Sequence, residues 1–97
     1  GNSFINAPQF VLEVLSPSTA KYDQTEKKKI YQSEEIPEYW IIDIRKRSIE
    51  IYDLDYEEDI PKYFLADTVT KENNEDLHLI HFPHIQIDFE QLFDGTG

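Results

Sequence analysis

The sequence predicts an α/β domain built on a mixed β-sheet, in which a helix crosses over between two parallel strands and antiparallel strands follow. Two segments, "QFVLEVL" and "EYWIIDI", are dense in β-branched and aromatic residues, and the segment between them has the composition of a helix. A strand, a helix and a strand in that order form the βαβ unit of parallel sheets. The segment "IEIYDL" then alternates apolar and polar residues, which is typical of a half-buried antiparallel strand.

Length and composition bound what this domain can be. The chain has 97 residues, of which 39% are apolar and 13% aromatic, enough for one folded domain over residues 1–97 with one core. It has no cysteine, which excludes disulfides and thiolate metal sites. No run approaches the ~20 apolar residues of a membrane span, and no basic region followed by an apolar stretch marks a signal peptide. We therefore expect a soluble, cytoplasmic protein.

The net charge of -11 is unevenly distributed along the chain. Residues 1–52 hold seven Lys or Arg and eight Asp or Glu, whereas residues 53–97 hold two and twelve. The total charge argues against general attraction to nucleic acid. A site in the first half nevertheless lies in a nearly neutral neighbourhood, and the local field matters more than the total when a polyanion docks.

The first half of the chain contains the predicted βαβ unit. The strand at residues 9–15 is apolar enough to be buried on both faces, and Pro17 ends it. The helix at residues 23–35 has Asp23 as its N-cap and Glu26 three residues later, an acidic form of the capping box. The strand at residues 38–44 follows, and "RKRS" supplies the turn into the antiparallel strand.

The second half gives weaker patterns. Residues 53–59 read as an exposed loop or strand end, and residues 60–66 as a short edge strand entered through Pro61. The segment "LHLIHF" at residues 77–82 predicts a further strand. A short C-terminal helix is predicted between a cap at Asp88 and a stop at Gly95.

A lone carboxylate, Glu13, lies in the middle of the first predicted strand. Burying an unpaired carboxylate costs on the order of several kcal/mol, so a fold keeps one only beside a hydrogen-bond donor, a cation or a metal. Because side chains alternate along a strand, Gln9 and Glu13 point to the same face. This pattern indicates a ligand site on that face or near the end of the strand. A structural ion pair between Glu13 and Lys27 or another lysine of the helix explains it equally well.

Helical geometry separates the three consecutive lysines of the predicted helix. At ~100° per residue, Lys27 falls on one stripe with Ile30 and Tyr31, whereas Lys28 and Lys29 turn away. We therefore expect Lys27 to lean toward the sheet, beside Glu13, and Lys28 and Lys29 to lie in solvent.

Three histidines, His78, His81 and His84, lie three residues apart. On a strand His78 and His81 face opposite sides, and Pro83 breaks any helix that could align them. This spacing disfavours a metal site, and the tyrosines and "EYW" are interpreted as core packing.

With these residues in view, "APQFVLEVLSPSTAKYDQTEKKKIYQSEEIPEYWIID" resembles the C-terminal portion of the Uma-two family of putative restriction endonucleases, in the PD-(D/E)XK nuclease superfamily. The likeness covers about residues 7 to 55. It rests on the E-V-L-S-P-S-T block, the D-x-x-x-K-x-x-x-Y helix and the P-E-Y-W-I-I-D strand, in family order. The resemblance implies a partial restriction-endonuclease-like fold, in a chain that forms the C-terminal part of a longer family domain.

The resemblance also implies a magnesium- or manganese-dependent nuclease site. It makes Glu13 a metal-ligating carboxylate, with the Val14 carbonyl as a further ligand, and Lys27 the catalytic lysine, since Leu15 occupies the usual lysine position. The Asp that the family carries after Pro is Gln9 here, a degenerate ligand position, because an amide is a poorer ligand than a carboxylate for a hard cation.

Two functions follow as expectations. The first is Mg²⁺-dependent hydrolysis of DNA phosphodiester bonds, with DNA as partner and a homodimer as the assembly that such nucleases often form. The second is a non-catalytic remnant of the nuclease fold that binds a protein partner, in which Glu13 and Lys27 are an internal salt bridge.

Overall fold

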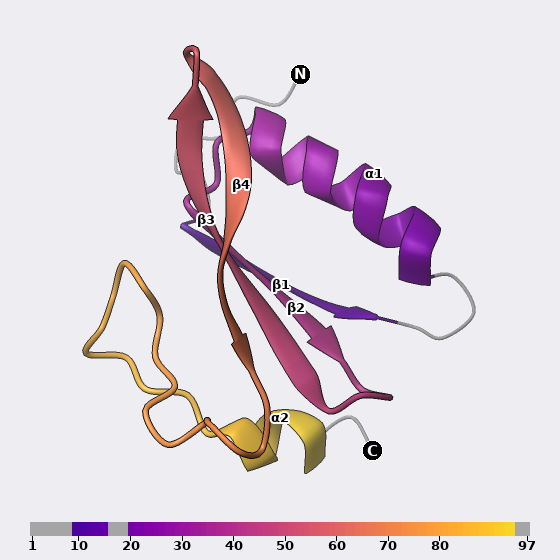
Figure 1. The fold of residues 1–97 in the computed structure, drawn as a ribbon, viewed down its shortest axis with the longest axis vertical. Coiled ribbons are helices and arrows are strands. Elements are labelled where there is room, and N and C mark those ends of the chain that lie inside the picture. The colour runs from indigo at the N-terminus through magenta and orange to yellow at the C-terminus, as the bar shows by residue number, and fades with distance from the viewer. Residues whose placement is uncertain (1–8, 16–19, 95–97) are drawn as a thin grey trace.

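A computed structural model describes residues 9–15 and 20–94 of the chain, with the side chains of residues 20–24 and Asp94 excepted. The described strands form one mixed sheet in the order β1-β2-β3-β4 (Figure 1). The elements are β1 (Phe10–Leu15), α1 (Ala20–Ser33), β2 (Glu38–Asp43), β3 (Ser48–Glu57), β4 (Ile60–Val69) and α2 (Phe89–Asp94). The predicted α/β class and the order of a crossover followed by antiparallel strands are confirmed.

The βαβ unit joins β1 and β2 as parallel neighbours, with Glu13 beside Ile41 in the register. β2 is buried along almost its whole length, whereas β1 is only half-buried. The prediction that β1 is buried on both faces was wrong because β1 lies at the edge of the described sheet.

Two antiparallel hairpins extend the sheet. The turn from β2 into β3 is held by Asp43, which accepts a hydrogen bond from the Lys46 amide at 3.0 Å. The turn from β3 into β4 has two residues, Glu58 and Asp59, at φ 52° and 66°, the left-handed pair of a type I′ hairpin turn. β3 therefore runs on through most of residues 53–59, the segment predicted as an exposed loop or strand end, and β4 is longer than predicted.

The two faces of the sheet pack against different parts of the chain (Figure 1). On one face, α1 covers a cluster of buried tyrosines and aliphatic residues: Tyr39, Ile41, Tyr52 and Tyr63. On the other face, the segment after β4 and α2 cover the larger cluster: Trp40, Ile42, Ile49, Ile51, Val69, Leu77, Leu79, Phe89 and Phe93. The single apolar run of β2 supplies both clusters, because successive side chains alternate between the faces.

The predicted helix differs from α1 in its start and in its rotation. α1 begins at Ala20, so Asp23 lies inside the helix and is not its cap. Its packed side is centred on Lys28, Tyr31 and Gln32, while Ile30 is 51% exposed. Ile30 was predicted to face the sheet. The sequence "KKKIYQ" has one aliphatic residue, which is too few to fix the phase of a helix.

The C-terminal third of the chain is organised by loops. Residues 77–82 do not form the predicted strand, and only His78 pairs there, through one bridge to Gln86. Leu77 and Leu79 are nevertheless buried in the core. α2 begins as predicted, with Asp88 Oδ1 accepting from the amides of Glu90 and Gln91 at 3.0 and 3.3 Å. The predicted stop at Gly95 lies outside the described residues.

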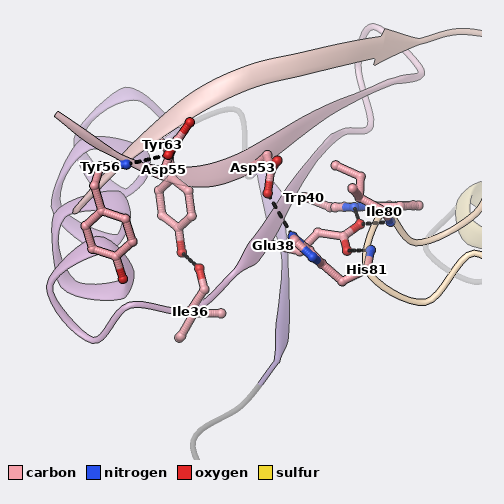
Figure 2. A network of polar contacts seen from close by, with 9 residues as sticks. All are labelled: Ile36, Glu38, Trp40, Asp53, Asp55, Tyr56, Tyr63, Ile80 and His81. Atoms are coloured by element: carbon pink, nitrogen blue, oxygen red, sulfur yellow. Dashed lines mark hydrogen bonds and ion pairs between the residues drawn. The ribbon is translucent and has the colours of Figure 1, made fainter.

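A buried carboxylate, Glu38, ties this loop segment to the sheet. The Glu38 side chain is fully buried and accepts from the Trp40 indole N–H at 2.7 Å (Figure 2). It also accepts from the backbone amides of Ile80 at 2.8 Å and His81 at 3.2 Å. The His81 ring in turn lies 2.8 Å from Asp53 on β3 (Figure 2). Glu38 therefore holds in place a segment that makes almost no ladder hydrogen bonds of its own.

Glu38→Ala is expected to lower the free energy of unfolding by about 3 kcal/mol or more, because it leaves buried N–H donors without an acceptor. Urea denaturation measures the change. Glu50→Ala is the matched control, since Glu50 is a half-buried carboxylate that accepts one side-chain hydrogen bond, from Tyr52. Equal losses in the two variants would contradict the structural role of Glu38.

Candidate functional site

The predicted site centres on Glu13, in the middle of β1. Alternation along the strand places Glu13 on the face that α1 covers, with Val11 and Leu15. The Glu13 side chain is 18% exposed, so solvent reaches it although helix and sheet enclose most of it. α1 crosses above it because the βαβ connection lays the helix back along the strands that it joins.

Two side chains of α1 hold the Glu13 carboxylate, one on each oxygen. Lys27 Nζ donates to Oε2 at 3.3 Å, and the Tyr31 hydroxyl donates to Oε1. The two donors are four residues apart on the helix, which puts them on neighbouring turns of one side. The Lys27 side chain is 47% exposed. The ion pair is therefore the solvent-facing contact, and the phenol is the inner one.

Tyr31 is part of a cluster of aromatic rings between α1 and the sheet. Its ring packs edge-on against Tyr39, with 5.3 Å between centroids, and Tyr39 packs against Tyr52 and Tyr63 at 6.0 and 5.4 Å. Burial, then the hydrogen bond and charge of Glu13, raise the pKa of Tyr31 to about 12. Burial also raises the pKa of Tyr39, with Glu13 as the next cause. These phenols therefore stay neutral donors at neutral pH.

A second carboxylate lies on the same face of the sheet. Glu50 on β3 is in register with Ile41, which is in register with Glu13, so the two carboxylates flank Ile41. Glu50 accepts from the Tyr52 hydroxyl at 3.1 Å, and Lys28 Nζ lies 4.3 Å from the centre of the Tyr52 ring. Lys28 was predicted to lie in solvent. It is drawn inward by this cation–π contact, whereas Lys29 is exposed as predicted.

The structure brings Glu13 and Lys27 together as the sequence predicted and leaves other predicted residues apart. Gln9 lies just before β1 with an exposed side chain. Four residues of extended strand separate its Cα from that of Glu13, a span of roughly 13 Å. The histidines have separate surroundings: His78 bonds to the Asp76 carbonyl, His81 to Asp53, and His84 packs on Phe82.

Sequence reasoning missed the two residues with the most consequential polar contacts. Tyr31 was interpreted as an apolar member of the helix stripe, although its spacing of four from Lys27 is a signal that both reach one target. Glu38 was interpreted as part of a packed strand. Its partners at Ile80 and His81 are more than 40 residues away, and no local pattern predicts them.

The family model described as "Uma2: Putative restriction endonuclease" matches residues 1–89 of the chain. The chain belongs to this family. No curated protein matches it. The family is described as one of putative restriction endonucleases, and nucleases of this class typically depend on a metal ion.

A solved structure supports the Uma2 fold. The crystal structure of a putative nuclease belonging to DUF820 from Anabaena variabilis matches with a TM-score of 0.61 at 20% sequence identity. The match covers 94% of this chain and 46% of that one. The likeness establishes the fold, in a chain that spans less than half the length of the nuclease it matches.

The residues that the structure describes fit a divalent cation at the lower limit of a ligand set. Mg²⁺ is commonly held by one or two carboxylates together with waters and substrate phosphates. Glu13 supplies one partly exposed carboxylate, whose outer oxygen is paired with the half-exposed Lys27. Among residues 9–15 and 20–94, no group of three or more His, Cys, Asp or Glu residues is arranged to hold a metal.

Of the helices in the same ranges, none is long and apolar enough to span a membrane.

Raising the pH is expected to destabilise the protein between about pH 10 and 12. The pKa of Tyr31 rises to about 12 in the folded state, against about 10 unfolded. The stabilisation that Tyr31 contributes to the folded state is therefore complete below pH ~10 and is lost as the pH rises through its folded pKa. Urea denaturation at stepped pH measures the loss.

Tyrosine ¹³Cζ shifts test the cause. Glu13→Gln lowers the pKa of Tyr31, which stays above the ordinary value because burial is the larger cause. Glu50→Gln is the control. It lowers the pKa of Tyr52 instead, which burial and then the charge and hydrogen bond of Glu50 raise to about 12. An unchanged Tyr31 titration in Glu13→Gln would show that the two side chains do not bond in solution.

Proposed function

We propose that the protein is a metal-dependent endonuclease that hydrolyses DNA phosphodiester bonds, with Glu13 and Lys27 as its catalytic residues. The observation that carries the proposal is the Glu13–Lys27 pair, a carboxylate and an ammonium 3.3 Å apart at a solvent-accessible edge of the sheet. Family membership in Uma2 supports the reaction class. The natural setting that we propose is the cytoplasm, in a longer chain that acts as a homodimer.

Each residue of the pair has a distinct role in this proposal. Glu13, with the Val14 carbonyl, would hold the ion, and a Mg²⁺ or Mn²⁺ ion supplies Lewis acidity toward a phosphate oxygen and a bound water. Lys27 has an exposed ammonium that can leave Glu13 and donate to a phosphate oxygen, where it stabilises the negative charge that develops in hydrolysis. Gln9 adds no charge to the ion, so this protein is expected to bind it weakly.

Cleavage of supercoiled plasmid DNA in Mn²⁺ tests the proposal on the natural full-length protein. Glu13→Gln and Lys27→Gln are each expected to reduce the cleavage rate at least 100-fold, because each removes a charge that acts on the reacting phosphate. Lys29→Gln is the matched control, since Lys29 is an exposed neighbour on the same helix. The proposal fails if the wild type cleaves no better than Glu13→Gln.

A Mg²⁺ titration followed by NMR tests the degenerate ligand position, Gln9. If Gln9 occupies a ligand position, Gln9→Asp adds a carboxylate and tightens Mg²⁺ binding. An unchanged Mg²⁺ affinity would remove Gln9 from the site and leave Glu13 as its carboxylate.

A second candidate function is a non-catalytic module that binds a protein partner. The observation that favours it is that both Glu13 oxygens already accept hydrogen bonds from side chains of this chain. In that case Lys27 neutralises Glu13 permanently, and the nuclease fold serves as a scaffold.

Stability with and without Mg²⁺ separates the two candidates. In a non-catalytic module, Mg²⁺ adds no stability to the wild type, and Glu13→Ala lowers the free energy of unfolding by about 1–2 kcal/mol because Tyr31 loses its acceptor. In a metal site, Mg²⁺ at ten times its Kd raises the free energy of unfolding of the wild type by roughly 1.4 kcal/mol and leaves that of Glu13→Ala unchanged. Urea denaturation without Mg²⁺ and with Mg²⁺ at ten times its measured Kd measures both.

A further inference from the structure

We propose that Tyr31 is the positioning residue of the site: its hydroxyl anchors Oε1 of Glu13, so that Oε2 can exchange Lys27 for a divalent cation. The inference rests on the proposed function, which assigned Glu13 and Lys27 and gave Tyr31 no role. It turns on the difference between the two donors that share one carboxylate.

The two contacts differ in charge and in exposure. Lys27 is a cation on a flexible side chain that is 47% exposed, and its bond to Oε2 is 3.3 Å long. Such an exposed ion pair is weak and exchanges readily. The Tyr31 hydroxyl is neutral and bonds to Oε1 from inside the interface between α1 and the sheet. A neutral donor does not repel an arriving cation, whereas an ammonium on the same carboxylate does.

The surroundings of Tyr31 keep its hydroxyl in place. Its ring lies edge-on against Tyr39, at 5.3 Å and 61°, and Tyr39 is itself fully buried. Gln32, the next residue on α1, accepts from the Tyr63 amide of β4 at 2.8 Å, which fixes the helix against the far strand. The Tyr31 phenol is therefore fixed by packing before any ligand arrives.

A hydrogen bond to the back oxygen of a ligating carboxylate has a known consequence. Such partners orient the ligand, and their removal typically weakens metal binding about 10–100-fold. The Tyr39 hydroxyl is a second neutral group on this side of Glu13. It is buried and makes no hydrogen bond among the described residues. It lies close enough to Glu13 for the carboxylate charge, after burial, to raise its pKa. The neutral phenols of Tyr31 and Tyr39 thus lie on the buried side of Glu13.

The inference predicts opposite effects for the two partners of Glu13. Mn²⁺ affinity, measured by calorimetry and by paramagnetic broadening of the Glu13 amide signal, is expected to fall about 10–100-fold in Tyr31→Phe. Lys27→Gln is expected to raise it several-fold, because the competing cation is gone. Tyr31→Phe keeps the ring that packs on Tyr39, so the fold is retained.

Tyr56→Phe is the matched control, because Tyr56 also donates its hydroxyl to a carboxylate, Glu35, at an exposed place on the hairpin. It should bind Mn²⁺ like the wild type. Mn²⁺ affinity in Tyr31→Phe equal to or above that of the wild type overturns the inference, and so does an absence of Mn²⁺ binding at Glu13 in every variant. Loss of DNA cleavage with these Mn²⁺ affinities as expected would overturn the proposed function and leave the role of Tyr31 standing.

Discussion

The packing of α1 against the tyrosine-bearing face of the sheet is the contact on which the site depends. Among residues 25–33 of α1, whose side chains the structure describes, little aliphatic surface faces the sheet. These residues attach the helix through Tyr31 in the aromatic cluster, Lys28 over Tyr52 and Gln32 on the Tyr63 amide. Aromatic pairs of this kind contribute about 0.5–1.5 kcal/mol beyond their buried area. The same packing of α1 places Lys27 and Tyr31, which donate hydrogen bonds to Glu13. Positioning of the carboxylate and attachment of the helix are therefore one interaction.

Glu38 and Glu13 show how the hydrogen-bond partners of a carboxylate decide what its charge can do. Glu38 accepts two of its three hydrogen bonds from backbone amides, which are fixed by the loop that they belong to. Glu13 accepts from two side chains, one of them half-exposed. Rigid backbone donors make Glu38 a structural residue because it has no exchangeable contact. In the proposed site, Glu13 keeps one contact, to Lys27, that a solvent cation would replace on binding.

The sequence was informative where the physics is local. Alternation and β-branched content located β1 to β3, and helical spacing placed Lys27 beside Glu13, because these depend on periodicities of two and 3.6 residues. The sequence was misleading for the rotation of α1, where Ile30 is exposed and Lys28 is half-buried. Lys28 packs inward because the aromatic face of the sheet holds its ammonium through a cation–π contact with Tyr52. The segment around Leu77 was beyond local reasoning, because Glu38 fixes it from a distant strand.

The uneven charge of the chain becomes intelligible once the sheet order is known. β1 and β4 lie at opposite edges of the described sheet, so Glu13 is three strand spacings from β4, or roughly 14 Å. That exceeds the Debye length of about 8 Å at physiological ionic strength. Asp67 on β4 is thus largely screened from Glu13. A polyanion that approached along β1 would meet the half of the sequence in which seven Lys or Arg nearly balance eight Asp or Glu, so the local charge there opposes docking less than the total of -11 suggests.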